Sequence, residues 1–295
     1  MIRTLLSAAL TAGGLASAAL MPASGDTRGG ATYLGTYVWH EKWRNFGGFS
    51  ALKLAADGLA FTTLSDRSTL VTGHLVRDAS GVVTAVEADT HVWLRDRGGR
   101  HLVGERADSE GLAVGSDGTI WISFEGIARV RQEGRDGALP FLLPNSPDFA
   151  RMRDNASLEA LAVDADDVLY TIPELPFRGE DDFPVYRLRD GAWDIAFRIP
   201  QRDGFAVSDA DIGPDGRFYI LERDFTGLGF RSRVRRMHMD GSAEEILLTT
   251  QTGTHDNLEG LAVWNDGQSL RATMIADDNL RFFQQTEIVD YRLPD

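Results

Sequence analysis

Carboxylates recur at matched positions on either side of short turns, and these residues could do chemistry. Glu110 and Glu125 stand 15 residues apart around a turn at Asp117, and Glu159 and Glu174 repeat that spacing. In an antiparallel hairpin, the acid that enters the first strand and the acid that leaves the second lie at the same end. Each pair could therefore bind a metal ion or take part in catalysis.

Less regular copies of this pair of acids occur elsewhere in the chain. In the first copy Ser50 stands where the other copies have the acid that enters the first strand, which we call the leading acid. Like charges held close together raise one another's pKa or require compensation. A hard cation such as Ca²⁺, which takes about six to eight oxygen ligands, could supply it. The structural alternative is that each acid accepts hydrogen bonds from backbone amides of its own repeat. The nine acids expected to face one channel mouth, as ligands of a Ca²⁺ ion, are Asp66, Glu110, Glu125, Glu159, Glu174, Asp209, Glu222, Glu259 and Asp277.

Arginines beside these acids could bind an anionic substrate. Arg67 directly follows Asp66, and Arg223 directly follows Glu222. Metal-assisted hydrolysis combines a cation that polarises a phosphoryl oxygen with arginines that hold the other oxygens. The alternative role of both arginines is a salt bridge with the adjacent acid. The expected catalytic residues are Arg67, Arg223 and Glu259, and the expected substrate-binding residues are Arg67, Arg223, Arg231 and Asn257.

Other chemistries are excluded by what the sequence lacks. There are no cysteines, which removes disulfides, thiolate catalysis and cysteine-ligated zinc. There is no G-x-S-x-G, H-E-x-x-H, P-loop or dinucleotide motif, and of six scattered histidines only His255 lies beside a repeated acid. Thirty basic residues against 44 acidic ones give a net charge of −14, which disfavours nucleic acid and anionic membranes as partners.

A repeat of about fifty residues must position these side chains. Each copy has an apolar run, a turn with aspartate, a second β-prone run and an acid, over residues 49–66, 110–125, 159–174, 208–222 and 259–278. The turn residues Asp57, Asp117, Asp167, Asp215 and Asp266 are separated by 60, 50, 48 and 51 residues. Asp-Gly turns predict hairpins, and about four short strands per repeat are typical of a β-propeller blade. The sequence therefore predicts an all-β propeller with five blades, while the longer first interval leaves six open.

Both ends of the chain bear on this prediction. An orphan strand at 31–41 is expected to pair into the incomplete last blade and close the ring, which would remove the exposed edges. Residues 1–25 have the layout of a signal peptide, with Arg3, an apolar stretch and small-residue cleavage candidates. An uncleaved anchor helix is the alternative. We expect cleavage between about residues 18 and 26, export to the periplasm or extracellular space, and one monomeric propeller domain over 31–295 without stable membrane insertion.

Several segments, in chain order, carry a resemblance to a known family. They are FGGFSALKL (46–54), TLSDR (63–67), DSEGLAVGSDGTIWIS (108–123), NASLEALAV (155–163), VSDADIGPDGRFYILERDF (207–225), NLEGLAV (257–263) and ADDN (276–279). Together they resemble the phytase-like domain family, known as "esterase-like activity of phytase". The sequence departs from the family pattern at 50–52, 124–125 and 159–160. The resemblance implies a secreted propeller with phosphoester or ester hydrolase activity on a small anionic substrate.

Two other functions stay open. One is a calcium-dependent lactonase-like activity, for which Asn155, Asn257 and Asn279 would supply neutral oxygen ligands. The other is non-enzymatic binding of a peptide, glycan or partner protein.

Overall fold

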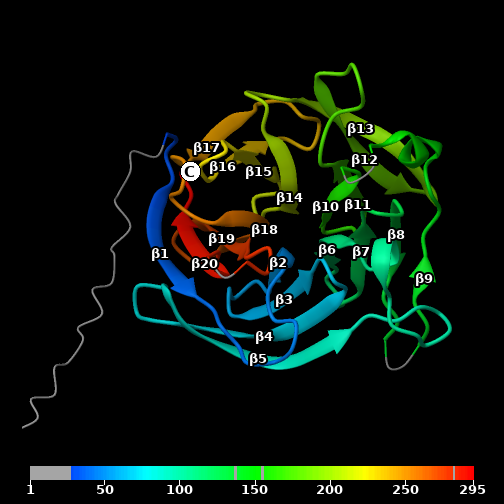
Figure 1. Ribbon diagram of the computed structural model, residues 1–295. Coiled ribbons are helices and arrows are strands. Elements are labelled where there is room, and N and C mark those ends of the chain that lie inside the picture. Colours follow the sequence, from blue (N-terminus) through cyan, green and yellow to red (C-terminus); the bar gives the residue numbers. More distant parts are fainter. Residues whose placement is uncertain (1–27, 136–137, 154–155, 282) are drawn as a thin grey trace, which may run out of the picture.

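Five four-stranded antiparallel sheets surround a common axis in the computed structural model, which describes residues 28–135, 138–153, 156–281 and 283–295 (Figure 1). The predicted all-β propeller is confirmed, with five blades and not six. Within these ranges no helix is long and apolar enough to cross a membrane. The expected signal peptide at 1–25, like Asn155, lies outside the described residues.

The first three blades use consecutive strands, ordered from the axis outward. Blade 1 contains β2 (Phe49–Leu54), β3 (Ala60–Ser65), β4 (Thr69–Arg77) and β5 (Val83–Trp93). Blade 2 contains β6 (Ser109–Val114), β7 (Ile120–Phe124), β8 (Arg129–Gln132) and β9 (Phe141–Leu142). Blade 3 contains β10 (Leu158–Val163), β11 (Leu169–Pro173), β12 (Asp182–Arg189) and β13 (Ala192–Pro200). Two short 3-10 helices, η1 (Gly104–Arg106) and η2 (Pro147–Arg151), precede the inner strands of blades 2 and 3.

The ring closes through the N-terminal strand. Blade 4 contains β14 (Ala206–Ile212), β15 (Phe218–Phe225), β16 (Phe230–Met237) and β17 (Glu245–Thr249). Blade 5 contains β18 (Asn257–Asn265), β19 (Leu270–Asp277) and β20 (Glu287–Arg292), and its outer strand is β1 (Thr32–Val38). The antiparallel pairing of β1 with β20 confirms the predicted closure, which joins the two ends of the described chain in one sheet.

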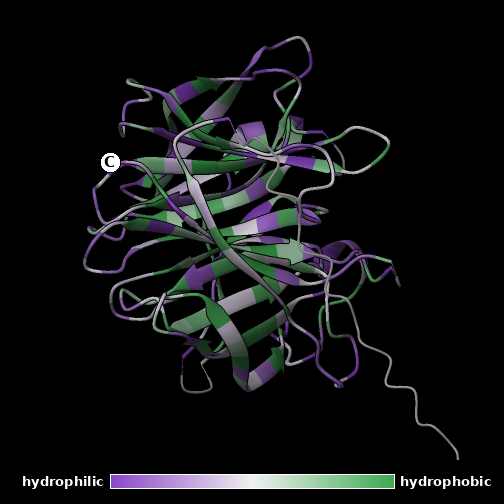
Figure 2. Ribbon diagram, turned by 90° about the vertical axis from the view of Figure 1, so that its left-hand side faces the viewer, coloured by the Kyte–Doolittle hydropathy of each residue, from purple (hydrophilic) through white to green (hydrophobic). Residues whose placement is uncertain are grey.

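Hydrophobic side chains fill the spaces between neighbouring blades. Successive side chains of a strand point to opposite faces, so each blade presents apolar residues to both neighbours. Ile172 of blade 3, for example, packs in one cluster with Ile220 of blade 4. Figure 2 shows the hydrophobic segments along the strands and many of the hydrophilic ones in the loops at their ends. Buried Trp39 stacks on Phe49 at 5.0 Å, which ties the N-terminal segment to blade 1.

A β-bulge or similar irregularity interrupts every innermost strand at the same repeat position. The register shifts lie between Phe49 and Ala51, Ser109 and Leu112, Leu158 and Ala160, Val207 and Asp209, and Leu258 and Gly260. A bulged residue is left out of the ladder, and its side chain is re-aimed. The residues inside these shifts are Ser50, Glu110 with Gly111, Glu159, Ser208 and Glu259, so three leading acids, Glu110, Glu159 and Glu259, sit at bulges.

Candidate functional site

Eight carboxylates and one guanidinium line a small cavity at one end of the inner strands, which we call the acidic mouth. Its volume is about 160 Å³. Seven of the nine acids expected there do line it, and the sequence repeat therefore identified most of its wall. The lining residues are Asp66, Asp108, Glu110, Glu125, Glu159, Glu174, Arg223, Glu259 and Asp277.

Two repeat positions build most of this wall. The first is the bulge residue, which is an acid in blades 2, 3 and 5. The second lies on the neighbouring strand. In blade 3, Leu158 precedes the bulge and pairs with Pro173, and the next residue, Glu174, occupies this position. Across the blades this second position holds Asp66, Glu125, Glu174, Arg223 and Asp277.

Asp209 does not reach the mouth, and its expected placement there is wrong. In blade 4 the bulge residue is Ser208, so Asp209 lies one position further along and points to the other side of β14. Its fully buried carboxylate accepts hydrogen bonds from Lys53 Nζ at 3.1 Å and from the backbone N–H of Leu261 at 2.8 Å. Asp209 therefore binds a buried lysine below the mouth.

Glu222 is also placed elsewhere, because Arg223 takes the second mouth position of blade 4. Glu222 pairs with Val207 in the ladder and its fully buried carboxylate faces away from the mouth. It accepts hydrogen bonds from Arg233 Nε at 2.6 Å and from Arg235 Nη2 at 2.6 Å. Glu222 is thus the centre of a buried ion-pair network in blade 4.

A constant spacing in the sequence could have identified the offset of Asp209. In all five repeats the bulge residue precedes an aspartate of the hairpin turn by seven residues, as in Ser50 to Asp57 and Ser208 to Asp215. In the fourth repeat, counting back seven residues from Asp215 selects Ser208 and not Asp209.

Arg223 bridges the acids of two blades. Its Nη2 lies 3.0 Å from Glu174 Oε1 and 3.4 Å from Glu159 Oε1, both in blade 3. Its Nη1 contacts Glu259 and lies 3.4 Å from Asn257 Oδ1, both in blade 5. Burial opposes the charge of Arg223, but the carboxylates of Glu159 and Glu174 outweigh it and raise the pKa of the guanidinium. Arg223 therefore compensates the blade 3 and blade 5 acids.

The other predicted substrate-binding residues lie at different distances from the mouth. Arg67 stands at its edge, with a half-exposed side chain whose Nε is 3.8 Å from Asp66 Oδ1. Asn257 is buried beneath the mouth, and its Nδ2 donates a hydrogen bond to Glu259 Oε1 at 2.6 Å. Arg231 lies outside the mouth, where it pairs with Asp224 at 2.5 Å.

Asp108 is a mouth residue that sequence reasoning missed. It directly precedes β6, and its carbonyl oxygen accepts the backbone N–H of Glu125 at 2.9 Å. The segments DSEGLAV and NLEGLAV align Asp108 with Asn257, which was selected as a site residue. This alignment could therefore have identified Asp108 as a residue of the mouth.

Burial and mutual repulsion perturb the acids of the mouth. Burial, and next the charge of Asp277, raises the pKa of Asp66 to about 7. Burial, and next the charge of Glu174, raises the pKa of Glu125 to about 7. Burial and neighbouring glutamates raise the pKa of Glu110 well above its usual value. Without a cation, this cluster would thus hold protons near neutral pH.

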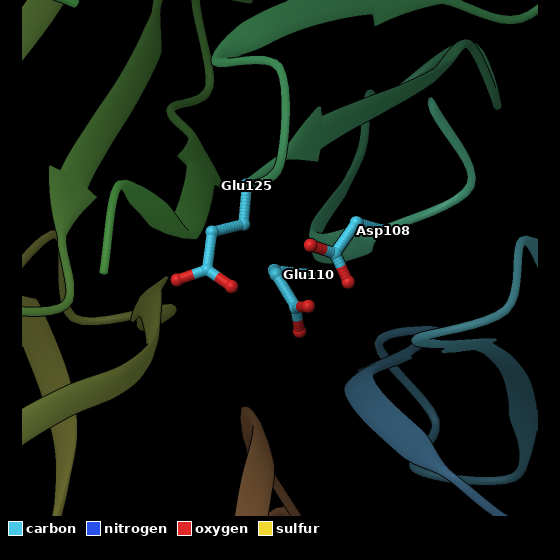
Figure 3. Close-up of side chains that lie close together, drawn as sticks. All are labelled: Asp108, Glu110 and Glu125. Carbon is cyan, nitrogen blue, oxygen red and sulfur yellow. The ribbon is translucent and has the colours of Figure 1, made fainter. Parts of the chain in front are cut away.

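Two groups of three acids have a geometry that suits a metal ion. They are Asp108, Glu110 and Glu125, drawn in Figure 3, and Glu125, Glu159 and Glu174. Within each group one oxygen per residue lies within 4.8 Å of the others. Oxygens on opposite sides of a Ca²⁺ ion are about 4.6–5.2 Å apart, twice the usual metal–oxygen distance. The spacing and the all-oxygen donor set both fit a hard cation.

One buried oxygen of the mouth also lacks a hydrogen-bond partner. Among the described residues, no hydrogen-bond donor reaches the buried Oδ1 of Asp66. A buried acceptor in that state costs free energy unless a ligand, ion or water satisfies it. Asp66 Oδ1 could therefore accept a hydrogen bond or contact a cation.

Comparison with known proteins gives a family match. A family model for phytase-like proteins, described as "Esterase-like activity of phytase", matches residues 44–280. None of the curated proteins compared with the chain matches it.

Solved structures with similar folds are distant in sequence. A gluconolactonase from Xanthomonas campestris is 16% identical, with 80% of this chain and 69% of that chain covered and a TM-score of 0.43. Virginiamycin B lyase from Staphylococcus aureus is 13% identical, with 82% of this chain and 71% of that chain covered and a TM-score of 0.41. A luciferin-regenerating enzyme is 14% identical, with 84% of this chain and 78% of that chain covered and a TM-score of 0.43. Similarity at this level does not bear on the activity of this chain.

Proposed function

The chain belongs to the phytase-like family, and on that premise we propose that it hydrolyses esters or phosphoesters at the acidic mouth with a bound divalent cation. The observation that carries the proposal is the excess of acid: eight carboxylates and one guanidinium around about 160 Å³. So many acids cannot all be ionised in that space without compensation. An anionic substrate would be repelled from them unless a cation were bound.

Blade 2 offers the best position for the cation. Glu159 and Glu174 already contact Arg223, which compensates their charge. No arginine or lysine forms an ion pair with Asp108, Glu110 or Glu125 among the residues described in the structure. These three acids would therefore hold a Ca²⁺ ion or a similar hard cation. When bound, the cation would polarise an ester or phosphoryl oxygen and make a water molecule more acidic.

Residues of the chain would orient the substrate against that position. Arg223 holds the carboxylates of Glu159, Glu174 and Glu259 in place and keeps their side of the mouth compensated. Arg67, half exposed at the edge, is free to swing toward an anionic group of the substrate. Glu259 is fixed by both Arg223 and Asn257, so its carboxylate has a defined direction toward the cavity.

A hydrolysis assay with metal control tests this proposal. Chelator-treated protein is assayed with 4-nitrophenyl phosphate, 4-nitrophenyl acetate and a simple lactone, before and after addition of Ca²⁺. We expect hydrolysis of at least one of the two 4-nitrophenyl esters, its loss in chelator and its recovery with Ca²⁺. Glu110→Gln should lower the rate about tenfold or more, whereas Glu87→Gln, on the outer strand β5, should not change it.

The other outcomes separate the alternatives. Hydrolysis of the lactone alone would favour the lactonase-like activity. Metal binding without hydrolysis of any of the three compounds, or neither binding nor hydrolysis, would contradict the proposed enzyme and favour a binding protein.

A further inference from the structure

A second, larger depression lies beside the acidic mouth, between blades 4 and 5. Its volume is about 710 Å³, against about 160 Å³ for the mouth. Small-molecule pockets usually measure about 300–1,000 Å³. The mouth alone therefore has room for a cation and the reacting group of a substrate, and the remainder of the substrate must lie outside it.

One wall of this depression, which we call the blade 4–5 groove, is apolar and comes from the β15–β16 hairpin. Phe225 and Phe230 are partners in the ladder, with ring centroids 5.0 Å apart. Leu228 lies at the tip of the hairpin and is 95% exposed, and Phe225 is 63% exposed. Single exposed apolar residues are ordinary, but two exposed apolar residues beside the partly buried Phe230, within six residues along one depression, are typical of a binding surface.

The groove is continuous with the mouth along two elements. Arg223 and Phe225 are two residues apart on β15, whose pairing with β16 has no register shift, so both side chains point to the same face. On the other side, Asn279 of the groove donates its backbone N–H to Oδ1 of Asp277 in the mouth at 2.7 Å. A ligand could therefore extend from one cavity into the other.

The facing wall combines the exposed ring of Phe283 with several polar groups that are hydrogen-bonded to one another or to neighbouring residues. Asp256 accepts hydrogen bonds from Gln284 Nε2 at 2.6 Å and from the backbone N–H of Gln285 at 2.8 Å. His255 is hydrogen-bonded through Nε2 to the hydroxyl of Tyr291 at 2.7 Å. An apolar wall opposite a few fixed polar groups is the usual composition of a pocket for an organic ligand.

We propose that the blade 4–5 groove binds an aromatic part of the ester substrate while the ester group reaches the acidic mouth. This inference rests on the proposed function, and it makes the substrate class an aryl or arylalkyl ester. The two phenylalanine rings favour an aromatic occupant, since aromatic pairs gain from edge and offset contacts beyond the area that they bury.

A depression on the blade 2 side of the mouth provides the matched control. Its volume is about 580 Å³, and it is lined by Arg100, Arg106, Val103 and Ile127 among others. Its charged lining suits an aromatic group less well than the phenylalanine wall does. Ile127 is 44% exposed there, which makes Ile127→Ala comparable with a truncation of Phe225.

The test compares two non-hydrolysable ligands that share the anionic group. The dissociation constants of benzylphosphonate and methylphosphonate are measured by calorimetry on the full-length protein in Ca²⁺. We expect the wild type to bind benzylphosphonate about tenfold more tightly. Phe225→Ala and Leu228→Ser should each reduce that preference several-fold without changing the affinity for methylphosphonate, and Ile127→Ala should leave both affinities unchanged.

The contrary outcomes are distinct. Equal affinity of the wild type for both ligands overturns the groove and leaves the proposed function standing, as does a preference that survives both groove substitutions. A preference lost only in Ile127→Ala assigns the aromatic group to the blade 2 depression and also overturns the groove. If neither phosphonate binds, the result contradicts the proposed function and the groove with it.

Discussion

Calcium should stabilise this protein strongly at pH 8 and weakly at pH 5. Burial raises the pKa of Asp277 from 3.8 to about 6, and it is also the main cause that raises the pKa of Asp66 and Glu125 to about 7. A carboxyl group with a higher pKa in the folded chain binds its proton more tightly there than in the unfolded chain. Its contribution to stability is complete below about pH 4 and is lost as the pH rises through the folded pKa, here between about pH 4 and 7.

Asp277 alone gives the scale of this loss, because only 6% of the residue is exposed. Raising the pKa of this carboxyl group from 3.8 to about 6 corresponds to about 3 kcal/mol of unfolding free energy. For a domain of this size, 1 kcal/mol changes Tm by about 2 °C, so ionisation of Asp277 should lower Tm by about 6 °C. Asp66 and Glu125 are more exposed, and solvent screens their contributions.

A bound cation opposes this loss. At a hundredfold excess over its Kd, a ligand adds about 2.7 kcal/mol to the unfolding free energy, or about 5 °C in Tm. At pH 5 the cation must displace protons from the same carboxylates, so its effect is smaller. The calcium shift in Tm should therefore grow from pH 5 to pH 8.

Thermal unfolding followed by fluorescence from pH 5 to 8, in chelator and in excess Ca²⁺, measures both effects. Asp277→Asn should flatten the pH dependence in chelator, while Glu87→Gln should leave it as in the wild type. A Tm that stays constant or rises with pH in chelator would refute the destabilising ionisation of these carboxylates. A calcium shift of the same size at pH 5 and pH 8 would refute the competition between calcium and protons.

Three further predictions concern the fold and the ends of the chain. Glu222→Gln removes the fully buried carboxylate that Arg233 and Arg235 share, and only Asp203 and Glu244 would still pair with them, at 3.0 and 3.2 Å. The change should cost about 3 kcal/mol, seen as a lower urea midpoint; an unchanged midpoint contradicts the buried network. Deletion of residues 31–41 should open the ring and cause aggregation, which gel filtration detects, whereas a soluble truncation with cooperative unfolding argues against the closure. N-terminal sequencing of exported protein should start between about residues 18 and 26, and an intact Met1 there rules out the cleavage.

The sequence was sufficient to predict the architecture because the signals that define a blade are local. Each hairpin is encoded by a short turn with an aspartate between two β-prone runs, and the five copies of that turn determine five blades. The unpaired strand before the first copy predicts the closure, since a last blade with three strands would leave an exposed edge.

The pattern of acidic residues predicts the site only in part, because that pattern does not show where each inner strand is bulged; the seven-residue spacing to the turn aspartate marks that position instead. One residue of slip moves a side chain to the other face of its strand. In blade 4 that slip separates Ser208 from Asp209 and Arg223 from Glu222. Asp209 and Glu222 look like mouth acids in the sequence, and yet each binds a buried basic side chain.

At the second mouth position, blade 4 has Arg223 where the other four blades have an acid, so the charge around the mouth is uneven. With acids at that position in all five blades, the ring would repel an anion from every side. Arg223 instead forms ion pairs with acids of blades 3 and 5 and with none of the described acids of blade 2, where we propose that the cation binds. In a ring of five, blade 2 lies directly opposite the boundary between blades 4 and 5 (Figure 1). A substrate in the blade 4–5 groove would thus pass Arg223 and present its ester group toward blade 2. The same substitution that breaks the repeat therefore accounts for both the proposed cation position and the proposed orientation of the substrate.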